Sequence, residues 1–155
     1  MFMLIMSGVE LNIKLNLLSH LEVNVMAILN QVIIVEGKTD KKRVKQVIDQ
    51  PIEIICTNGT MGIDKLDEMI ESLYDKQVYV LADADDEGEK IRKWFKKYLS
   101  ESKHIHIDKQ YGEVARCPKA YLSKVLAKHG FLVKDEEKVA KAKLDYIAER
   151  VSLLT

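Results

Sequence analysis

Two stretches decide the fold: QVIIVEG at residues 31–37 and QVYVLADAD at residues 77–85. Each begins with a short, continuous run of apolar residues, the pattern of a strand that is covered on both faces. Each run then ends abruptly at an acidic residue, Glu36 in the first stretch and Asp83 in the second. The sequence therefore predicts two buried strands whose carboxyl ends both carry a carboxylate.

Working outward from these stretches, apolar runs of strand length alternate with segments of helical periodicity. Two further strands are expected at residues 52–56 and 103–107. The expected helices cover residues 39–46, 63–74, 87–99, 118–129 and 136–152. Such alternation predicts an α/β fold, a mostly parallel four-stranded sheet with helices on both faces.

The chain of 155 residues has the length of one ordinary domain. We expect that domain to cover residues 26–130, with a charged helix in residues 131–155 packed on it. Residues 1–25 form an N-terminal extension that we expect to be dispensable, and residues 10–25 alternate loosely, as a strand would. No apolar run approaches the roughly 18 to 20 residues of a membrane span, so we expect no membrane partner.

Composition narrows the function classes. Basic and acidic residues balance at 24 each, which argues against a protein that coats DNA through its overall charge. The two cysteines, Cys56 and Cys117, have neither CxxC nor zinc-like spacing. Reduced thiols in a cytoplasmic protein are the simplest interpretation.

Carboxylates dominate the predicted functional edge. In an open α/β sheet, ligands bind beyond the carboxyl ends of the strands, where Glu36, Asp83 and Asp85 fall. Gathering like charges is costly unless a cation shares the site. Mg²⁺ is the natural occupant because it prefers oxygen ligands and keeps waters that a phosphate can replace, and Mn²⁺ could substitute. The competing interpretation is that a lone Asp-x-Asp is a solvated turn and a lone glutamate a stop signal.

The segments VIIVEGKTD, residues 32–40, and LADADDEGE, residues 81–89, resemble the two motifs of the Toprim domain, which has a Rossmann-like fold. The resemblance covers roughly residues 31–130. It implies that Glu36 is the general acid or base and that Asp83 and Asp85 bind the metal. Residues 83–89 are similar to the topoisomerase form of the motif, which makes Glu87 a candidate third ligand. The following residues look closer to the Toprim ribonucleases, which usually have proline where Glu87 stands.

Basic and turn residues around this edge are candidates for phosphate binding. We expect Lys38 to assist catalysis, and we expect Gly37, Asn58, Gly59 and Arg92 to contact phosphate or nucleic acid. Most other lysines and arginines are expected only to solvate helix faces. His104 and His106 alternate on the last strand, and packing is their commoner use.

Three functions are compatible with these features. The leading hypothesis is an enzyme that performs Mg²⁺-dependent phosphodiester chemistry on RNA or DNA, as a nuclease or by nucleotidyl transfer. The alternative is a non-catalytic nucleic-acid-binding or regulatory Toprim module that acts with a protein partner, which could supply specificity. A receiver-like signalling domain would also gather acids at strand ends, but it would need an acidic pair after the first strand instead of Glu36-Gly37-Lys38.

Overall fold

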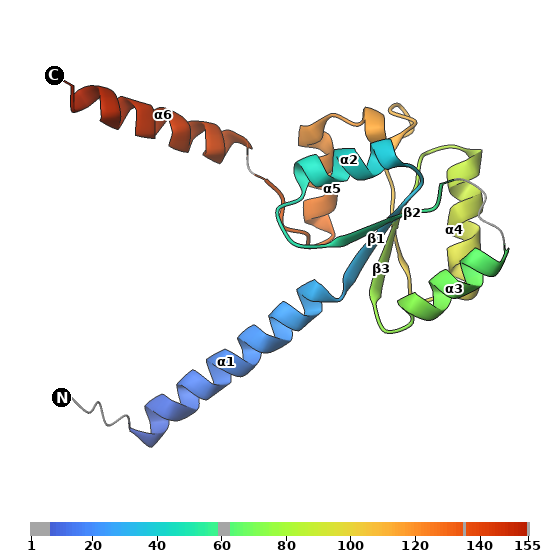
Figure 1. Ribbon diagram of the computed structural model, residues 1–155, viewed down its shortest axis with the longest axis horizontal. Helices are drawn as coiled ribbons and strands as arrows, with labels where there is room; N and C mark the ends of the chain where they lie inside the picture. The colour runs from blue at the N-terminus through green and yellow to red at the C-terminus, as the bar shows by residue number, and fades with distance from the viewer. Residues whose placement is uncertain (1–6, 59–62, 135, 155) are drawn as a thin grey trace.

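A computed structural model describes residues 7–58, 63–134 and 136–154 of the chain. Its centre is a four-stranded, fully parallel sheet with the strand order β2-β1-β3-β4 (Figure 1). The strands are β1 (Gln31–Val35), β2 (Glu53–Cys56), β3 (Gln77–Leu81) and β4 (Lys103–Ile105). The predicted fold class and all four predicted strands are confirmed, with ends that shift by one or two residues.

Helices cover both faces of this sheet. The helices are α1 (Gly8–Leu29), α2 (Lys38–Val47), α3 (Ile63–Leu73), α4 (Asp86–Tyr98), α5 (Lys119–Lys128) and α6 (Glu136–Ser152), with a 3₁₀ turn, η1 (Val114–Arg116), before α5. Of these, α2 to α5 cover the sheet. Helices α2 and α5 share one apolar core with the sheet, and α3 and α4 share the other. The result is a three-layer arrangement with a core on each side of the sheet.

Strand β1 shows why its sequence is apolar throughout. Ile33 and Val35 belong to the core beneath α2 and α5, whereas Val32 and Ile34 belong to the core beneath α3 and α4. Successive side chains of a strand point to opposite faces, so a strand covered on both sides cannot alternate with polar residues. All four side chains are fully buried, and each such burial contributes about 1.5–3 kcal/mol to stability.

The N-terminal segment differs from the prediction. Residues 8–29 form helix α1, not a strand, and this helix extends away from the body of the domain (Figure 1). Because its apolar residues alternate with polar ones along the sequence, they point to all sides of the helix. Leu17 and Leu21 are both 59% exposed. The alternation of apolar and polar residues, which suggested a strand, thus belongs to a helix that has no amphipathic face.

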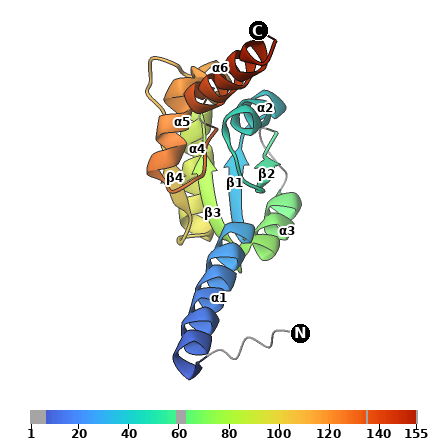
Figure 2. The ribbon, with the colours of Figure 1, turned by 90° about the vertical axis from the view of Figure 1, so that its left-hand side faces the viewer.

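The last helix also departs from expectation. Helix α6 has the predicted bounds, but it extends away from the domain instead of packing on it, and α1 and α6 leave at opposite ends of the body in Figure 2. Leu144 and Ile147 are therefore largely exposed. Across the described residues, no helix combines the length and the apolar character that crossing a membrane requires.

The strand order places a crevice at the carboxyl ends of β1 and β3. From β1 the chain crosses to β2 on one side, and later β3 pairs with β1 on the other side and leads on to β4. This reversal of direction is the topological switch point at which open α/β sheets bind their ligands. The residues that directly follow β1 and β3 are therefore the first candidates for function.

Candidate active site

Glu36 and Asp83 meet at this switch point. Glu36 directly follows β1, Asp83 lies two residues after the last residue of β3, and the paired register of the two strands brings their ends level. The main-chain N–H of Asp83 donates a hydrogen bond of 2.8 Å to Oε1 of Glu36. The predicted convergence of these two acids is thus present as a direct bond between them.

Asp83 is held in place from a second direction. Its Oδ1 accepts a 2.7 Å hydrogen bond from the main-chain N–H of Val114 in η1, and only 7% of the residue is exposed. The next residue, Ala84, donates its N–H to the carbonyl of Gly112 at 2.7 Å. The loop after β4 therefore closes over the strand end and fixes the orientation of the Asp83 carboxylate.

Asp85 begins helix α4 as its N-cap residue. Its Oδ1 accepts a 2.8 Å hydrogen bond from the N–H of Gly88, which satisfies one of the otherwise unpaired donors of the first helical turn. The residue is exposed to solvent. Its second carboxylate oxygen has no hydrogen-bond donor within the described part of the chain, so it could bind a ligand.

Gly88 allows α4 to start this close to the strand. A Cβ atom at this position would overlap the carbonyl oxygen of Asp83. The space beside this glycine is filled by the backbone of Asp83. The position therefore requires glycine because of the close approach of two backbone segments, not because of an unusual φ angle.

Asp40 is a buried acid behind the site that the sequence analysis did not single out. It lies in the first turn of α2 and accepts hydrogen bonds of 3.0 Å from the N–H groups of both Gly37 and Ala115. It is 5% exposed. Asp40 thereby connects the loop after β1 with η1, the same turn that holds Asp83.

The carboxylates are harder to ionise than usual. Burial raises the pKa of Glu36 to about 7, and the charges of Asp83, Asp85 and Asp40 add to this effect against the opposing bond from Asp83 N–H. Burial likewise raises the pKa of Asp83 to about 6, with contributions from Asp40, Asp85 and Glu113. A carboxyl group whose pKa lies near 7 can both take and give a proton at neutral pH. Strongly shifted acids in one crevice are typical of functional sites.

Arg92 occupies a different place from the one we expected. Its guanidinium is 2% exposed and donates to the carbonyl oxygens of Ala82 at 2.9 Å and Ile105 at 2.8 Å. It therefore ties together the carboxyl ends of β3 and β4 and is occupied by these bonds. This burial favours a positioning role beneath the acidic edge over the predicted contact with phosphate, which stays a prediction.

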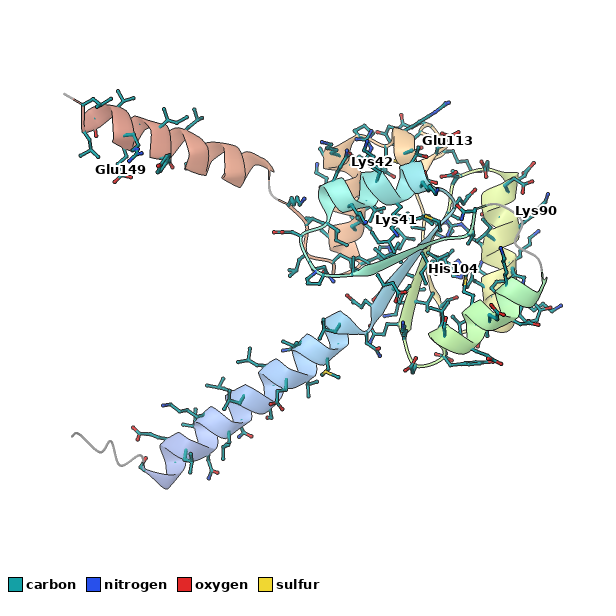
Figure 3. All side chains as sticks on the ribbon, in the orientation of Figure 1. Lys41, Lys42, Lys90, His104, Glu113 and Glu149 are labelled. Carbon is teal, nitrogen blue, oxygen red and sulfur yellow. The ribbon has the colours of Figure 1, made fainter. Side chains whose placement is uncertain are left out.

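Glu87 does not join the other acids. It lies in the first turn of α4, its side chain is 61% exposed, and it forms an ion pair of 2.9 Å with Lys90 (Figure 3 labels Lys90). Neither Glu36 nor Asp83 has Glu87 among the charges that raise its pKa. A ligand set of Asp83, Asp85 and Glu87 is thus not preassembled.

The remaining predicted residues lie beside Glu36, at the carboxyl ends of β1 and β2. Lys38 is exposed at the start of α2, and Gly37 is the N-cap residue of that helix. Asn58 follows β2 in a left-handed conformation with a φ of 53°, and its N–H donates to the carbonyl of Glu36 at 2.7 Å. The prediction for Gly59 falls outside the described residues.

The oxygen donors suit a hard divalent cation, but they do not yet enclose one. In Glu36, Asp83 and Asp85, a backbone N–H engages one carboxylate oxygen and fixes the group. Among residues 7–58, 63–134 and 136–154, no three acid, histidine or cysteine side chains stand close enough to surround an ion. Mg²⁺ tolerates this arrangement because it usually binds through one or two carboxylates and keeps several waters.

Comparison with known proteins identifies the family. The model of the Toprim domain matches residues 31–114. An uncharacterized protein of Bacillus subtilis, YusF, is 48% identical over 98 residues, which are 63% of this chain and 67% of that protein. Ribonuclease M5 of Borreliella burgdorferi is 33% identical over 114 residues, which are 71% of this chain and 62% of that enzyme.

A solved structure agrees with these matches. The structure of a small TOPRIM domain protein from Bacillus stearothermophilus superposes with a TM-score of 0.66 at 43% sequence identity, covering 68% of this chain and 90% of that protein. The receiver-like interpretation is thereby excluded. The acidic strand ends, the parallel sheet and the matched residues agree, and the chain belongs to the Toprim domain family.

Proposed function

We propose that this protein cleaves phosphodiester bonds in nucleic acid in a Mg²⁺-dependent reaction. The observation that carries the proposal is the hydrogen-bonded pair of Glu36 and Asp83 at the switch point, with a Glu36 pKa of about 7. Relatives that are named as ribonucleases make RNA the first substrate to test. Mn²⁺ is expected to replace Mg²⁺, since it favours the same oxygen ligands.

Glu36 has the properties of the general acid or base. One of its oxygens is fixed by Asp83 N–H, and the other can exchange a proton with the attacking or leaving oxygen of the substrate. Such a group contributes typically about 10²–10⁴-fold to a reaction rate. Lys38, two residues further along, is exposed and can place its ammonium group against a phosphate oxygen.

Asp83 and Asp85 are the residues that would hold the cation. Both carboxylates are oriented by backbone donors, Asp83 by Val114 and Asp85 by Gly88. When bound, Mg²⁺ would offset the negative charge that develops on the phosphate. The fixed orientation of the two acids means that little further ordering would be needed for binding.

The alternative is a module that binds nucleic acid without cutting it. One observation favours it: within the described residues, the acids are not gathered into a group of three around an ion position. The chain spans 62% of the Borreliella ribonuclease, and in this alternative a protein partner supplies specificity. Both free cysteines fit a cytoplasmic location for either function.

A cleavage experiment separates the two functions. Purified wild type, Glu36→Gln and the control Glu71→Gln on the exposed side of α3 would be incubated with structured RNA, single-stranded DNA and supercoiled DNA. Each reaction is run with Mg²⁺, with Mn²⁺ and with chelator. We expect cleavage that needs the metal, that Glu71→Gln retains and that Glu36→Gln abolishes. Binding without cleavage under every condition would replace the nuclease with the binding module.

A further inference from the structure

A broad groove lies beside α2, on the side of the domain where β2 forms the edge of the sheet. It has a volume of about 750 Å³. Its walls come from one face of α2 and from the edge strand β2 with the residues around it. The side chains of Lys38, Lys41, Lys45, Glu53, Cys56 and Asn58 are among those that line it.

Three of these residues are lysines on a single face of α2. Lys38, Lys41 and Lys45 are spaced i, i+3 and i+7, so their side chains stand one above the other along the helix. Lys42, which follows Lys41 directly, points to another side of α2 and does not line the groove (both are labelled in Figure 3). The lysines that line the groove are therefore those that share one face of the helix, whereas Lys42 on the same helix lies outside the groove.

The charge of these lysines is not neutralised by neighbours. Within the described ranges, none of the three ammonium groups has a carboxylate partner, whereas other lysines of the domain do. The one acid in the groove, Glu53, is itself paired with Lys76 at 3.0 Å. The groove is thus an unpaired positive surface on a chain whose basic and acidic residues balance overall.

One end of the groove lies beside the residue that follows β1, Glu36. Lys38 and Asn58 form its end near the active site, and the N–H of Asn58 donates to the carbonyl of Glu36 at 2.7 Å. From Lys38 to Lys45 the helix advances about 10 Å. A strand in a nucleic-acid duplex advances about 3.4 Å per phosphate, so this distance covers about three phosphates.

We propose that this groove binds the sugar-phosphate backbone of the substrate strand and leads the scissile phosphate to Glu36. The inference rests on the proposed function and extends it, because it assigns Lys41 and Lys45 as backbone-binding residues and sets the path of the strand. The acids at the edge repel phosphate, so a substrate needs positive charge next to them to approach. Contacts of this kind carry affinity and register but no sequence preference.

Binding without cleavage tests the proposal. All proteins carry Glu36→Gln so that the probe stays intact, and the probes are fluorescently labelled single-stranded RNA and single-stranded DNA oligonucleotides. Affinity is measured by anisotropy between about 50 and about 200 mM salt, where each lost phosphate contact lowers the slope of log K against log salt by about 0.7. The test variant is Lys41→Ala/Lys45→Ala. The matched control is Lys42→Ala/Lys93→Ala, which removes the same charge from exposed positions outside the groove.

We expect the groove variant to lower the slope by about 1.4 and to weaken binding at low salt by about tenfold or more, with little change in the control. Equal effects of both variants, or no binding by the parent protein, would overturn the proposal. If wild type cleaves and the two variants bind alike, the groove proposal is wrong and the proposed function stands. If the groove variant alone loses binding and wild type never cleaves, the groove proposal is correct and the proposed nuclease function is wrong.

Discussion

The N–H of Asp83 donates a 2.8 Å hydrogen bond to the carboxylate of Glu36, which joins the ends of two strands that lie 47 residues apart in sequence. This bond stabilises the ionised form of Glu36, but burial outweighs it and leaves the pKa near 7. The same bond fixes Glu36 relative to the backbone of the proposed metal ligand. This one contact thus connects the proposed acid-base group with the proposed cation site.

Glu36→Gln separates chemistry from stability. We expect cleavage to fall by about 10²-fold or more, because the amide cannot exchange the proton. Glutamine keeps an oxygen that can accept from Asp83 N–H and removes a charge that is unfavourable in the fold. At pH 8 we expect the free energy of unfolding to increase by about 1 kcal/mol, a small value because solvent screens this half-buried group. The melting temperature should then rise by about 2–4 °C. A lower melting temperature at pH 8 would show that the carboxylate is needed for folding.

Stability of wild type should decrease as the pH rises without metal. The folded-state pKa values of Glu36, about 7, and Asp83, about 6, lie above their usual 4.5 and 3.8. Between these limits the folded state binds more protons than the unfolded state, so the free energy of unfolding falls with increasing pH. The loss should occur between about pH 4 and pH 7. Urea unfolding at several pH values in the presence of chelator measures it, and Glu36→Gln should reduce the effect.

Mg²⁺ should reverse that loss. A cation that binds the ionised acids must displace their protons, so its affinity should rise as the pH passes 6 and 7. At 100 times its Kd, a ligand that binds only the folded state adds about 2.7 kcal/mol. We expect Mg²⁺ to raise the melting temperature more at pH 8 than at pH 5.5, and Asp83→Asn to lose this response. An equal rise in Asp83→Asn would place the ion elsewhere.

The sequence predicted the acidic edge because strand ends can be found from local patterns. The apolar runs of β1 and β3 end at Val35 and Leu81, and the acids follow within two residues. Parallel pairing then brings them together without further information. The two segments that resemble the Toprim motifs therefore lie side by side in the structure.

Residues that depend on three-dimensional packing were harder to interpret or were missed. Arg92 was expected to contact phosphate or nucleic acid, but it follows Gly88 and precedes Phe95 on the buried stripe of α4. Asp40 shares a buried stripe with Val44 and Val47 in the same way. Helical spacing could have placed both side chains toward the sheet. No periodicity precedes Glu113 or Val114, so their approach to Asp83 could not be predicted from sequence.

The N-terminal extension should be dispensable. Helix α1 extends from the domain with its apolar side chains exposed. Asn30 lies outside this helix, and its carbonyl accepts a hydrogen bond from the N–H of Gln77, the first residue of β3. A chain shortened to begin at Met26 keeps that bond. We expect unchanged metal response and a melting temperature within a few degrees of the full chain. Loss of folding in the shortened chain, measured by circular dichroism, would show that α1 supports the domain.

Gly88→Ala tests the close approach of α4 to the site. Alanine in the interior of a helix usually stabilises it by about 1 kcal/mol relative to glycine. Here the added Cβ would overlap the carbonyl oxygen of Asp83, so α4 or the strand end must move. We expect a destabilisation of about 1–3 kcal/mol, as in other overpacked sites.

The same displacement should weaken the metal response, because Asp85 caps α4 through the N–H of Gly88 and would move with it. Gly8→Ala in α1 is the matched control, since a Cβ there meets no atom within 4 Å. Urea unfolding and Mg²⁺-dependent melting of both variants provide the measurement. If Gly88→Ala were as stable as wild type and kept its metal response, the backbone of Asp83 could move away from the added Cβ without loss of stability. The close approach would then not define the site.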